Sequence, residues 1–176
     1  VQGNNRLSNN DIKRNARLFK GMKIKGNEIQ RAVKRLWKIN RFSNVQIFVT
    51  KETEEGIFLK IIVEELPILD KINFIGNKKK SKRSLEEEID LATGQILSDN
   101  IVFESILKIK SLYAEKHYHN VVIDTILTSG EIEYSTNLTF VINEGQKQKV
   151  KKIVFHGNDS FTNLKLNQQF EHNKSW

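Results

Sequence analysis

The chain of 176 residues carries 29 Lys and Arg against 21 Asp and Glu, which gives a formal net charge of +8. The complete absence of cysteine excludes disulfides, thiolate catalysis and cysteine-based zinc sites. No apolar run approaches the roughly 18 to 20 residues of a membrane-spanning helix. The length fits one ordinary domain or two small ones. The positive charge favours an anionic partner such as nucleic acid, lipid headgroups or acidic protein.

A Gly-Asn dipeptide recurs with spacings of 73 and 81 residues, at Gly3-Asn4, Gly76-Asn77 and Gly157-Asn158. Apolar residues stand nine and thirteen positions after each of these glycines, as on one face of a helix. Eighteen positions after the first two stands another glycine, Gly21 or Gly94, which predicts a left-handed helix C-cap. This agreement beyond the dipeptide indicates an internal repeat. The start at Val1, without an initiator Met or a signal-peptide pattern, favours a fragment of a longer protein.

In the first copy, Ser8 predicts the cap of a helix, and Asn27 predicts the cap of a second one. Phe42 then precedes two alternating strands that are joined by a turn at "KETEEG". Glu65 closes the copy. The predicted apolar faces are Ile12, Ala16 and Phe19 on the first helix, Ile29, Val33, Leu36 and Trp37 on the second, Val45, Ile47 and Val49 on the first strand, and Ile57, Leu59, Ile61 and Val63 on its partner.

The second copy opens with a strand at "DKINFI" that leads into Gly76. Ser81 or Ser84 predicts the cap of its first helix, and Ser98 or Asp99 the cap of its second. Tyr118 then precedes two strands, Glu144 closes the copy, and "KKIVFH" predicts the opening strand of a third. The predicted apolar faces are Val102, Ile106, Ile109 and Tyr113 on the second helix, Val121, Ile123 and Leu127 on the first strand of the hairpin, and Leu138, Phe140 and Ile142 on its partner.

Each copy therefore reads strand, helix, helix, strand, strand over about 75 residues, which is small for a self-sufficient core. Two helices on one face of a three-stranded sheet are the two-layer arrangement that this order allows. We predict an α+β chain with one unit at residues 1–67, whose opening strand is mostly missing, a second at 68–148, and the start of a third at 149–176.

Several segments carry a resemblance to a known family: "LWKINRFSNVQI", "INFIGN", "LYAEKHY", "VINEG", "VFHGNDSF" and the junction "VEELPILDKINFIGN". Their order and spacing resemble the POTRA repeats of the BamA family of outer-membrane protein assembly factors. The resemblance implies a β-α-α-β-β unit with a mixed sheet and two antiparallel helices. One departure is that Arg41 and His117 stand where the family has a glycine before the aromatic residue, so each must accept a positive φ or reshape the turn.

The resemblance also implies a function. It implies a periplasmic scaffold, not an enzyme, that precedes a membrane β-barrel in the same full-length chain, receives unfolded outer-membrane β-barrel proteins and docks accessory assembly lipoproteins. The repeats of two-partner secretion transporters, organelle import barrels and division proteins of the FtsQ type share this fold, so they stay open as alternatives.

The edge strands are the candidate peptide-binding site, because an edge exposes unpaired backbone donors and acceptors and main-chain pairing accepts any client sequence. The resemblance places the first strand of each hairpin outermost. Loops or a neighbouring repeat covering both edges are the alternative. The candidate residues are Val45, Gln46, Ile47, Phe48 and Val49 in the first copy, and Val121, Val122, Ile123, Asp124 and Thr125 in the second.

A candidate partner surface has an apolar part and a basic part. The alternation places Phe48, Phe58 and Ile62 on the sheet face opposite the core, where apolar side chains mark a partner or lie under a loop. The second Gly-Asn is followed by a basic corner that the other copies lack, so the fold does not require it. This corner faces an acidic partner or membrane, or is only solvated. Its residues are Lys78, Lys79, Lys80, Lys82 and Arg83.

Other kinds of site find no support in the sequence. His117 and His119, with Glu115 nearby in the sequence, lack the further ligands that would complete a metal site. No catalytic set and no phosphate-binding loop is present, so we expect neither a cofactor nor catalysis. An RNA-binding KH domain needs a G-x-x-G loop, and in "FKGMKIKGN" the two glycines, Gly21 and Gly26, are too far apart. No nucleic-acid partner is therefore expected.

Overall fold

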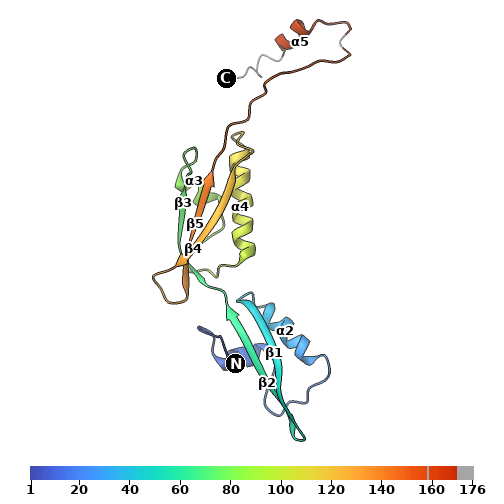
Figure 1. The fold of residues 1–176 in the computed structure, drawn as a ribbon, viewed down its shortest axis with the longest axis vertical. Coiled ribbons are helices and arrows are strands. Elements are labelled where there is room, and N and C mark those ends of the chain that lie inside the picture. The colour runs from blue at the N-terminus through green and yellow to red at the C-terminus, as the bar shows by residue number, and fades with distance from the viewer. Residues whose placement is uncertain (158, 170–176) are drawn as a thin grey trace.

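The computed structural model describes residues 1–157 and 159–169, and its helices and strands follow the predicted order. Two groups of elements, each a sheet with two helices, meet at Pro67 (Figure 1). The elements are α1 (Asn9–Ala16), α2 (Glu28–Trp37), β1 (Phe42–Thr53), β2 (Gly56–Glu65), β3 (Ile68–Ile75), α3 (Lys82–Glu88), α4 (Asp99–Ala114), β4 (Val122–Ser129), β5 (Ser135–Asn143) and α5 (Asn163–Gln169).

The first unit has an antiparallel pair, β1 and β2, and a single parallel bridge in place of the opening strand. The Gln2 N–H donates to the Ile61 carbonyl at 2.9 Å, and the Val63 N–H donates to the Gln2 carbonyl at 3.0 Å. α1 and α2 cover one face of this sheet (Figure 1). The buried core between them consists of Ile12, Ala16, Leu18, Ala32, Leu36, Phe42, Val45, Ile61 and Val63.

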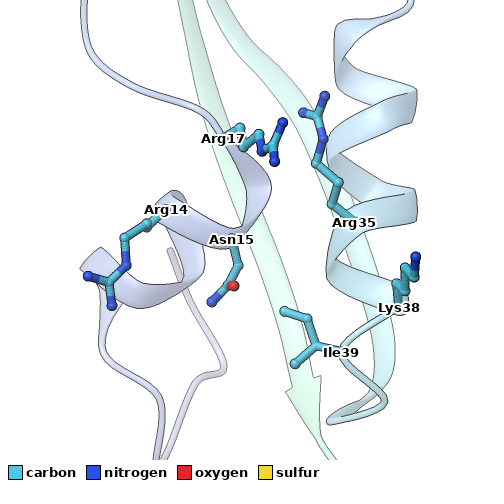
Figure 2. Close-up of a pocket in the computed structure, with 6 residues that line it drawn as sticks. All are labelled: Arg14, Asn15, Arg17, Arg35, Lys38 and Ile39. Carbon is cyan, nitrogen blue, oxygen red and sulfur yellow. The ribbon is translucent and has the colours of Figure 1, made fainter.

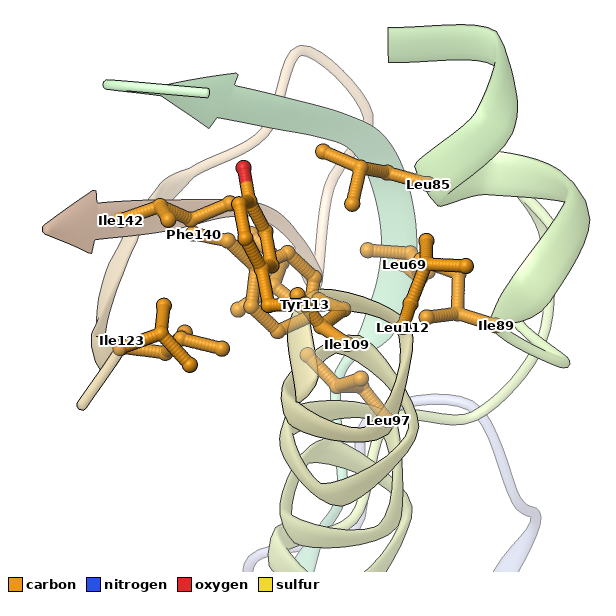
Figure 3. Close-up of a cluster of buried hydrophobic side chains, with 12 residues drawn as sticks. Leu69, Leu85, Ile89, Leu97, Ile109, Leu112, Tyr113, Ile123, Phe140 and Ile142 are labelled. Carbon is orange, nitrogen blue, oxygen red and sulfur yellow. The ribbon is translucent and has the colours of Figure 1, made fainter. Parts of the chain in front are cut away.

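The second unit has the complete mixed sheet, with strand order β3-β5-β4. β3 is parallel to β5 and β4 is antiparallel to it, which confirms the predicted fold class. Tyr113 of α4 and Phe140 of β5 point into the same space in the core (Figure 3). The Phe140 ring also stacks on Phe74 with the ring centroids 5.4 Å apart. Each large side chain that is fully buried here stabilises the unit by about 1.5–3 kcal/mol.

Three of the predicted helix caps are confirmed. The side chains of Ser8, Ser81 and Ser98 accept hydrogen bonds from the N–H groups of Asp11, Ser84 and Ile101. Such caps satisfy N–H groups that have no partner within the helix. Asn27 stands at the start of α2, but its side chain makes no capping bond.

The prediction that Gly21 and Gly94 are helix C-caps is wrong. α1 already ends at Ala16, where Arg17 takes the left-handed conformation with φ 57°. The apolar spacing continues past the helix because Leu18 enters the core from the irregular segment that follows. Gly94 instead attaches its loop to β3, since its N–H donates to the Leu69 carbonyl at 2.7 Å.

The Gly-Asn dipeptide is a structural turn at the end of each opening strand. A Cβ on Gly3 would lie 2.0 Å from the Val63 carbonyl oxygen, and one on Gly76 would lie 2.1 Å from that of Ile142. Both glycines have positive φ, at 82° and 88°. Only glycine allows the backbone to approach the closing strand so closely. The asparagine side chains fix the loop: the Nδ2 atoms of Asn4 and Asn77 donate to the carbonyls of Leu7 and Lys80.

The closing acids hold these same loops. Glu65 accepts hydrogen bonds from the N–H groups of Asn5, Arg6 and Leu7 at 2.9, 3.1 and 3.0 Å, and its side chain is only 3% exposed. Glu144 accepts from the Lys79 N–H at 2.6 Å and from the Tyr113 hydroxyl at 2.9 Å. Glu65 and Glu144 therefore cap the Gly-Asn loops. Each stands two residues after the closing-strand residue that the glycine of the loop approaches.

Glu65 should make the first unit sensitive to acid. Burial alone would raise the pKa of its carboxyl, but the three N–H donors and the Arg6 guanidinium outweigh burial and hold the pKa below its usual value. A depressed pKa contributes stability above the unfolded-state value of about 4.5, and this stability is lost as the pH falls through the folded-state value. We expect urea unfolding, followed by Trp37 fluorescence in a Trp176→Phe background, to show a smaller loss of stability between pH 5 and pH 3 in Glu65→Gln than in the parent. Equal losses would contradict this role.

The turn before the aromatic residue differs between the units. His117 accepts the positive φ, at 67°, whereas in the first unit Asn40 takes it, at 54°, one residue before Arg41. Asparagine tolerates this conformation better than most residues, because its short polar side chain bonds locally. The second unit therefore accepts a positive φ at the position where the family has glycine, and the first unit reshapes the turn.

The predicted opening strand at "KKIVFH" is not formed, and residues 151–156 are irregular. A strand needs a partner, and in the second unit the partner of β3 is β5, about 65 residues further along. In the described part of the chain no strand pairs with residues 151–156. Asn158 and residues 170–176 of the predicted third unit lie outside the described residues.

Candidate functional site

β4 lies at one edge of the second sheet, and among the strands of residues 1–157 and 159–169 it neighbours β5 alone (Figure 1). At the end of this ladder the Gly130 N–H donates to the Ser135 carbonyl at 3.1 Å, which makes these two residues a hydrogen-bonded pair. In an antiparallel ladder such pairs alternate. Counting back through the register, Ile123, Thr125 and Leu127 are therefore the residues whose N–H and C=O groups point away from β5.

The same argument applies to β1. The bonds of Gln2 show that Ile61 and Val63 direct their backbone groups toward the opening strand, so Ile62 bonds to β1 through Gln46. Val45 and Ile47 then direct their N–H and C=O groups outward. A register shift between Val49 and Lys51 interrupts this edge, and such bulges discourage further pairing. β4 pairs with β5 without a shift, so it offers the more regular edge.

Several apolar side chains of β4 and of the neighbouring helix α4 are exposed. Val121 and Ile123 are buried in the core, whereas Leu127, further along the same face, is 54% exposed. α4 lies beside β4 (Figure 1) and exposes Leu107 and Phe103, the latter by 58%. Val122 and Ile126 are exposed on the other face, with Asp124 between them, and Thr125 is exposed on the same face as Leu127. The edge thus offers apolar contacts next to backbone groups.

Two of these features were missed by sequence reasoning. Leu127 was assigned to the core, but its half of β4 extends beyond the side chains that α4 buries. Phe103 and Leu107 were not singled out, although their spacing of four places them on one helix face beside the core stripe.

The apolar part of the predicted partner surface lies on the first hairpin. Phe48 stands opposite Lys60, and Ile62 stands opposite Gln46, so these residues share the sheet face that the helices do not cover. Phe48 and Phe58 are exposed and Ile62 is half-buried. The Lys51 ammonium lies 5.9 Å from the centroid of the Phe58 ring. Val49 and Ile57, predicted for the core, are exposed as well, because the hairpin extends beyond the helices.

The basic corner has a structural role through its backbone. Lys79 and Lys80 contribute the N–H and C=O groups that Glu144 and Asn77 bind. Lys82 and Arg83 form ion pairs with Glu86 and Glu87 one helical turn away, at 3.5 and 2.8 Å. Such exposed pairs stabilise a helix by only about 0.3–0.5 kcal/mol. The side chains of Lys78 and Lys79 are exposed.

The described residues contain no group of three or more His, Asp or Glu side chains arranged to hold a metal ion. The rings of His117 and His119 lie 6.5 Å apart. Within residues 1–157 and 159–169, none of the helices has both the length and the apolar character to cross a membrane.

The fold is similar to that of a known family of domains. The POTRA family model, described as a surface antigen variable number repeat, matches residues 67–145. A solved structure of POTRA domains 1 and 2 from the periplasmic part of Omp85 of Anabaena matches with a TM-score of 0.51 and 19% identity, over 82% of this chain and 91% of that one. The N-terminal domain of Omp85 from Thermosynechococcus elongatus matches with a TM-score of 0.53 and 16% identity, over 76% of this chain and 55% of that one. Residues 67–145 are therefore a POTRA domain.

The curated relatives are more particular. The outer membrane protein assembly factor BamA of Nitratidesulfovibrio vulgaris is 26% identical over 78% of this chain, and that of Neorickettsia risticii is 23% identical over 94% of it. This similarity to BamA proteins agrees with the resemblance that the sequence patterns carry, and the family model matches the second unit alone. The chain spans only about a fifth of the length of these relatives, 17% and 22%.

Proposed function

We propose that this chain is a periplasmic scaffold segment of an outer-membrane protein assembly factor and that it binds unfolded outer-membrane β-barrel proteins as an added strand on β4. The full-length protein would continue into the membrane β-barrel that inserts them. The similarity to BamA proteins supports the setting. The outward backbone groups of Ile123, Thr125 and Leu127 support the binding mode.

The chemistry of the edge suits a receptor for many clients. Main-chain hydrogen bonds are independent of client sequence, and each contributes about 0.5–1.5 kcal/mol. Outer-membrane strands alternate apolar and polar residues. A client strand paired with β4 would place alternate side chains on the sheet face that carries the exposed Leu127. Selectivity for unfolded β-barrel clients then follows from this alternation.

The candidate partner surface lies apart from the β4 edge. Phe48, Phe58 and Ile62 form an apolar patch on the first unit, and Lys78 and Lys79 form a basic corner on the second. We assign these surfaces to the docking of accessory lipoproteins. Both lie outside the β4 edge, so docking and client binding do not compete for the same backbone groups.

Thr125→Pro tests the client site. Thr125 is exposed and its N–H points outward, so proline removes one donor and places its ring against an incoming strand without breaking a bond to β5. We expect a fluorescein-labelled peptide of about 12 residues from an outer-membrane strand to bind the variant at least about tenfold more weakly, which corresponds to about 1.4 kcal/mol. Fluorescence anisotropy measures this affinity.

The matched control is Thr125→Ala, which removes the side chain and keeps the N–H. Its affinity should stay within about twofold of the parent, since main-chain groups supply the binding. Circular dichroism and thermal unfolding establish that both variants are folded. A folded Thr125→Pro protein that binds the peptide as tightly as the parent would rule out strand addition at β4.

A further inference from the structure

The positive charge of the chain is concentrated in the helical layer of the first unit. We define this basic layer as residues 9–41, which run from the start of α1 to the residue before β1. It contains eleven Lys and Arg against two Asp and Glu. The corresponding layer of the second unit, residues 82–121, contains five against seven. Because two units of the same fold differ so strongly, the fold does not require the charge.

The two acids of the basic layer are already occupied. Asp11 pairs with Arg14 at 2.7 Å, and Glu28 pairs with Arg35 at 2.9 Å and with Arg31 at 3.8 Å. The remaining cations are exposed and form no ion pair with an acidic side chain of the described residues. They are Lys13, Arg17, Lys20, Lys23, Lys25, Lys34, Lys38 and Arg41. The layer therefore keeps a net positive charge that only an external anion neutralises.

Like charges converge between the two helices. Figure 2 shows Arg17, after α1, and Arg35, on α2, pointing toward one another across a depression of about 670 Å³. Its other lining residues include Arg14 and Lys38, and no acid lines it. Arg17 also has a left-handed φ of 57°, which strains residues other than glycine and asparagine. Turn geometry therefore gives no reason for an arginine at this position.

Aromatic side chains are exposed within the same layer. Phe19 is 61% exposed and Trp37 is 44% exposed. Phe19 begins the basic segment "FKGMKIKG". In this segment Met22 and Ile24 are half-buried, and the three lysines are exposed. Aromatic rings among Lys and Arg are typical of surfaces that lie in the interface of a bilayer, where the rings enter the headgroup region and the cations meet anionic lipids.

We propose that the basic layer of the first unit binds the surface of a bilayer that carries anionic headgroups. Phosphate groups enter between Arg17 and Arg35, and Phe19 and Trp37 insert at the headgroup level. The charge is spread over both helices and their connection, which suits an extended anionic plane better than a single acidic peptide. This binding uses the first unit, so it is independent of the client site on β4.

Trp37 provides the readout. Trp176→Phe leaves Trp37 as the only tryptophan, and the 176-residue chain is mixed with vesicles of phosphatidylcholine that contain about 30% phosphatidylglycerol or none. We expect co-sedimentation, a blue shift and protection from acrylamide with the anionic vesicles only. Binding should weaken steeply between about 50 and 500 mM salt, because screening shortens the Debye length.

Two pairs of substitutions locate the surface. Lys34→Gln with Lys38→Gln on the basic layer should weaken vesicle binding about 30-fold, at about fivefold per lysine. Lys110→Gln with Lys116→Gln removes the same charge from the helical layer of the second unit and should leave binding within about twofold. Circular dichroism checks the fold of each variant.

Three results would overturn the proposal. The first is no binding to anionic vesicles at low salt. The second is an equal loss in both pairs of variants, which would assign binding to net charge alone. The third is tight binding of a random oligonucleotide or polyglutamate at near-physiological salt without vesicle binding, which would assign the surface to another polyanion.

Discussion

Gly76→Ala should unfold or severely destabilise the second unit, at a cost of about 3–5 kcal/mol. The added Cβ would lie 2.1 Å from the Ile142 carbonyl oxygen, so β3 has to move away from β5 and the parallel ladder is disturbed. The left-handed φ of 88° adds a further strain of about 1–2 kcal/mol. Urea unfolding followed by circular dichroism measures this loss, while Trp37 fluorescence in a Trp176→Phe background should report a first unit that is little changed.

Gly94→Ala is the matched control for this effect. Gly94 has nearly the same φ, 86°, but no atom lies within 4 Å of the position of its added Cβ. Only the conformational strain remains, so the cost should be about 1–2 kcal/mol. Equal losses in the two variants would show that the close approach of Gly76 to Ile142 is not what the Gly-Asn turn requires.

Glu144→Ala should cost the second unit about 3 kcal/mol. The substitution leaves the buried Tyr113 hydroxyl and the part-buried Lys79 N–H without their acceptor, and a buried donor without a partner costs about 1–3 kcal/mol. Burial, and after it the hydrogen bond to Glu144, raises the pKa of Tyr113, so the phenol stays protonated and donates. Urea unfolding followed by circular dichroism checks this loss.

Combining Glu144→Ala with Tyr113→Phe separates the contributions of the two hydrogen bonds that Glu144 accepts. In Glu144→Ala the hydroxyl is stranded, and removing it in the double variant should restore about 1 kcal/mol. The Lys79 N–H remains without its acceptor, so the double variant stays below the parent. Additive losses from the two single substitutions would contradict a direct bond between these side chains.

The repeat and its order of elements could be predicted because they depend on local patterns. The spacing of Gly3 and Gly76, the serine caps and the alternation of the strands each act over a few residues. The reason for the closing acids could not be predicted, since Glu65 and Glu144 bind loops about 60 residues away in the chain. Gly21 and Gly94 do not cap helices because α1 and α3 end several residues before them. Leu18 and Ile89, which follow the helix ends, are buried in the two cores.

The candidate site, too, could be predicted only in part from the sequence. That β4 forms an edge follows from the strand order, which the family resemblance implied. Alternation along the strands placed Val49 and Leu127 in the core, and helical spacing placed Trp37 there, yet all three are exposed. The two strand residues are exposed because the strands reach beyond the helices. The phase of the hydrogen bonds along β4 depends on the turn at Gly130, which the sequence does not specify. That phase identifies Thr125 as the residue to change.

Amide hydrogen exchange, resolved by residue with NMR, tests strand addition most directly. With a saturating client peptide, the outward amides of Ile123, Thr125 and Leu127 should exchange more slowly, since each gains a hydrogen-bond acceptor. The amides of Val122, Asp124 and Ile126 already face β5 and should change little. Slower exchange in this alternating pattern is the result that we predict. An unchanged rate at the three outward amides while the peptide is bound would contradict binding at the β4 edge.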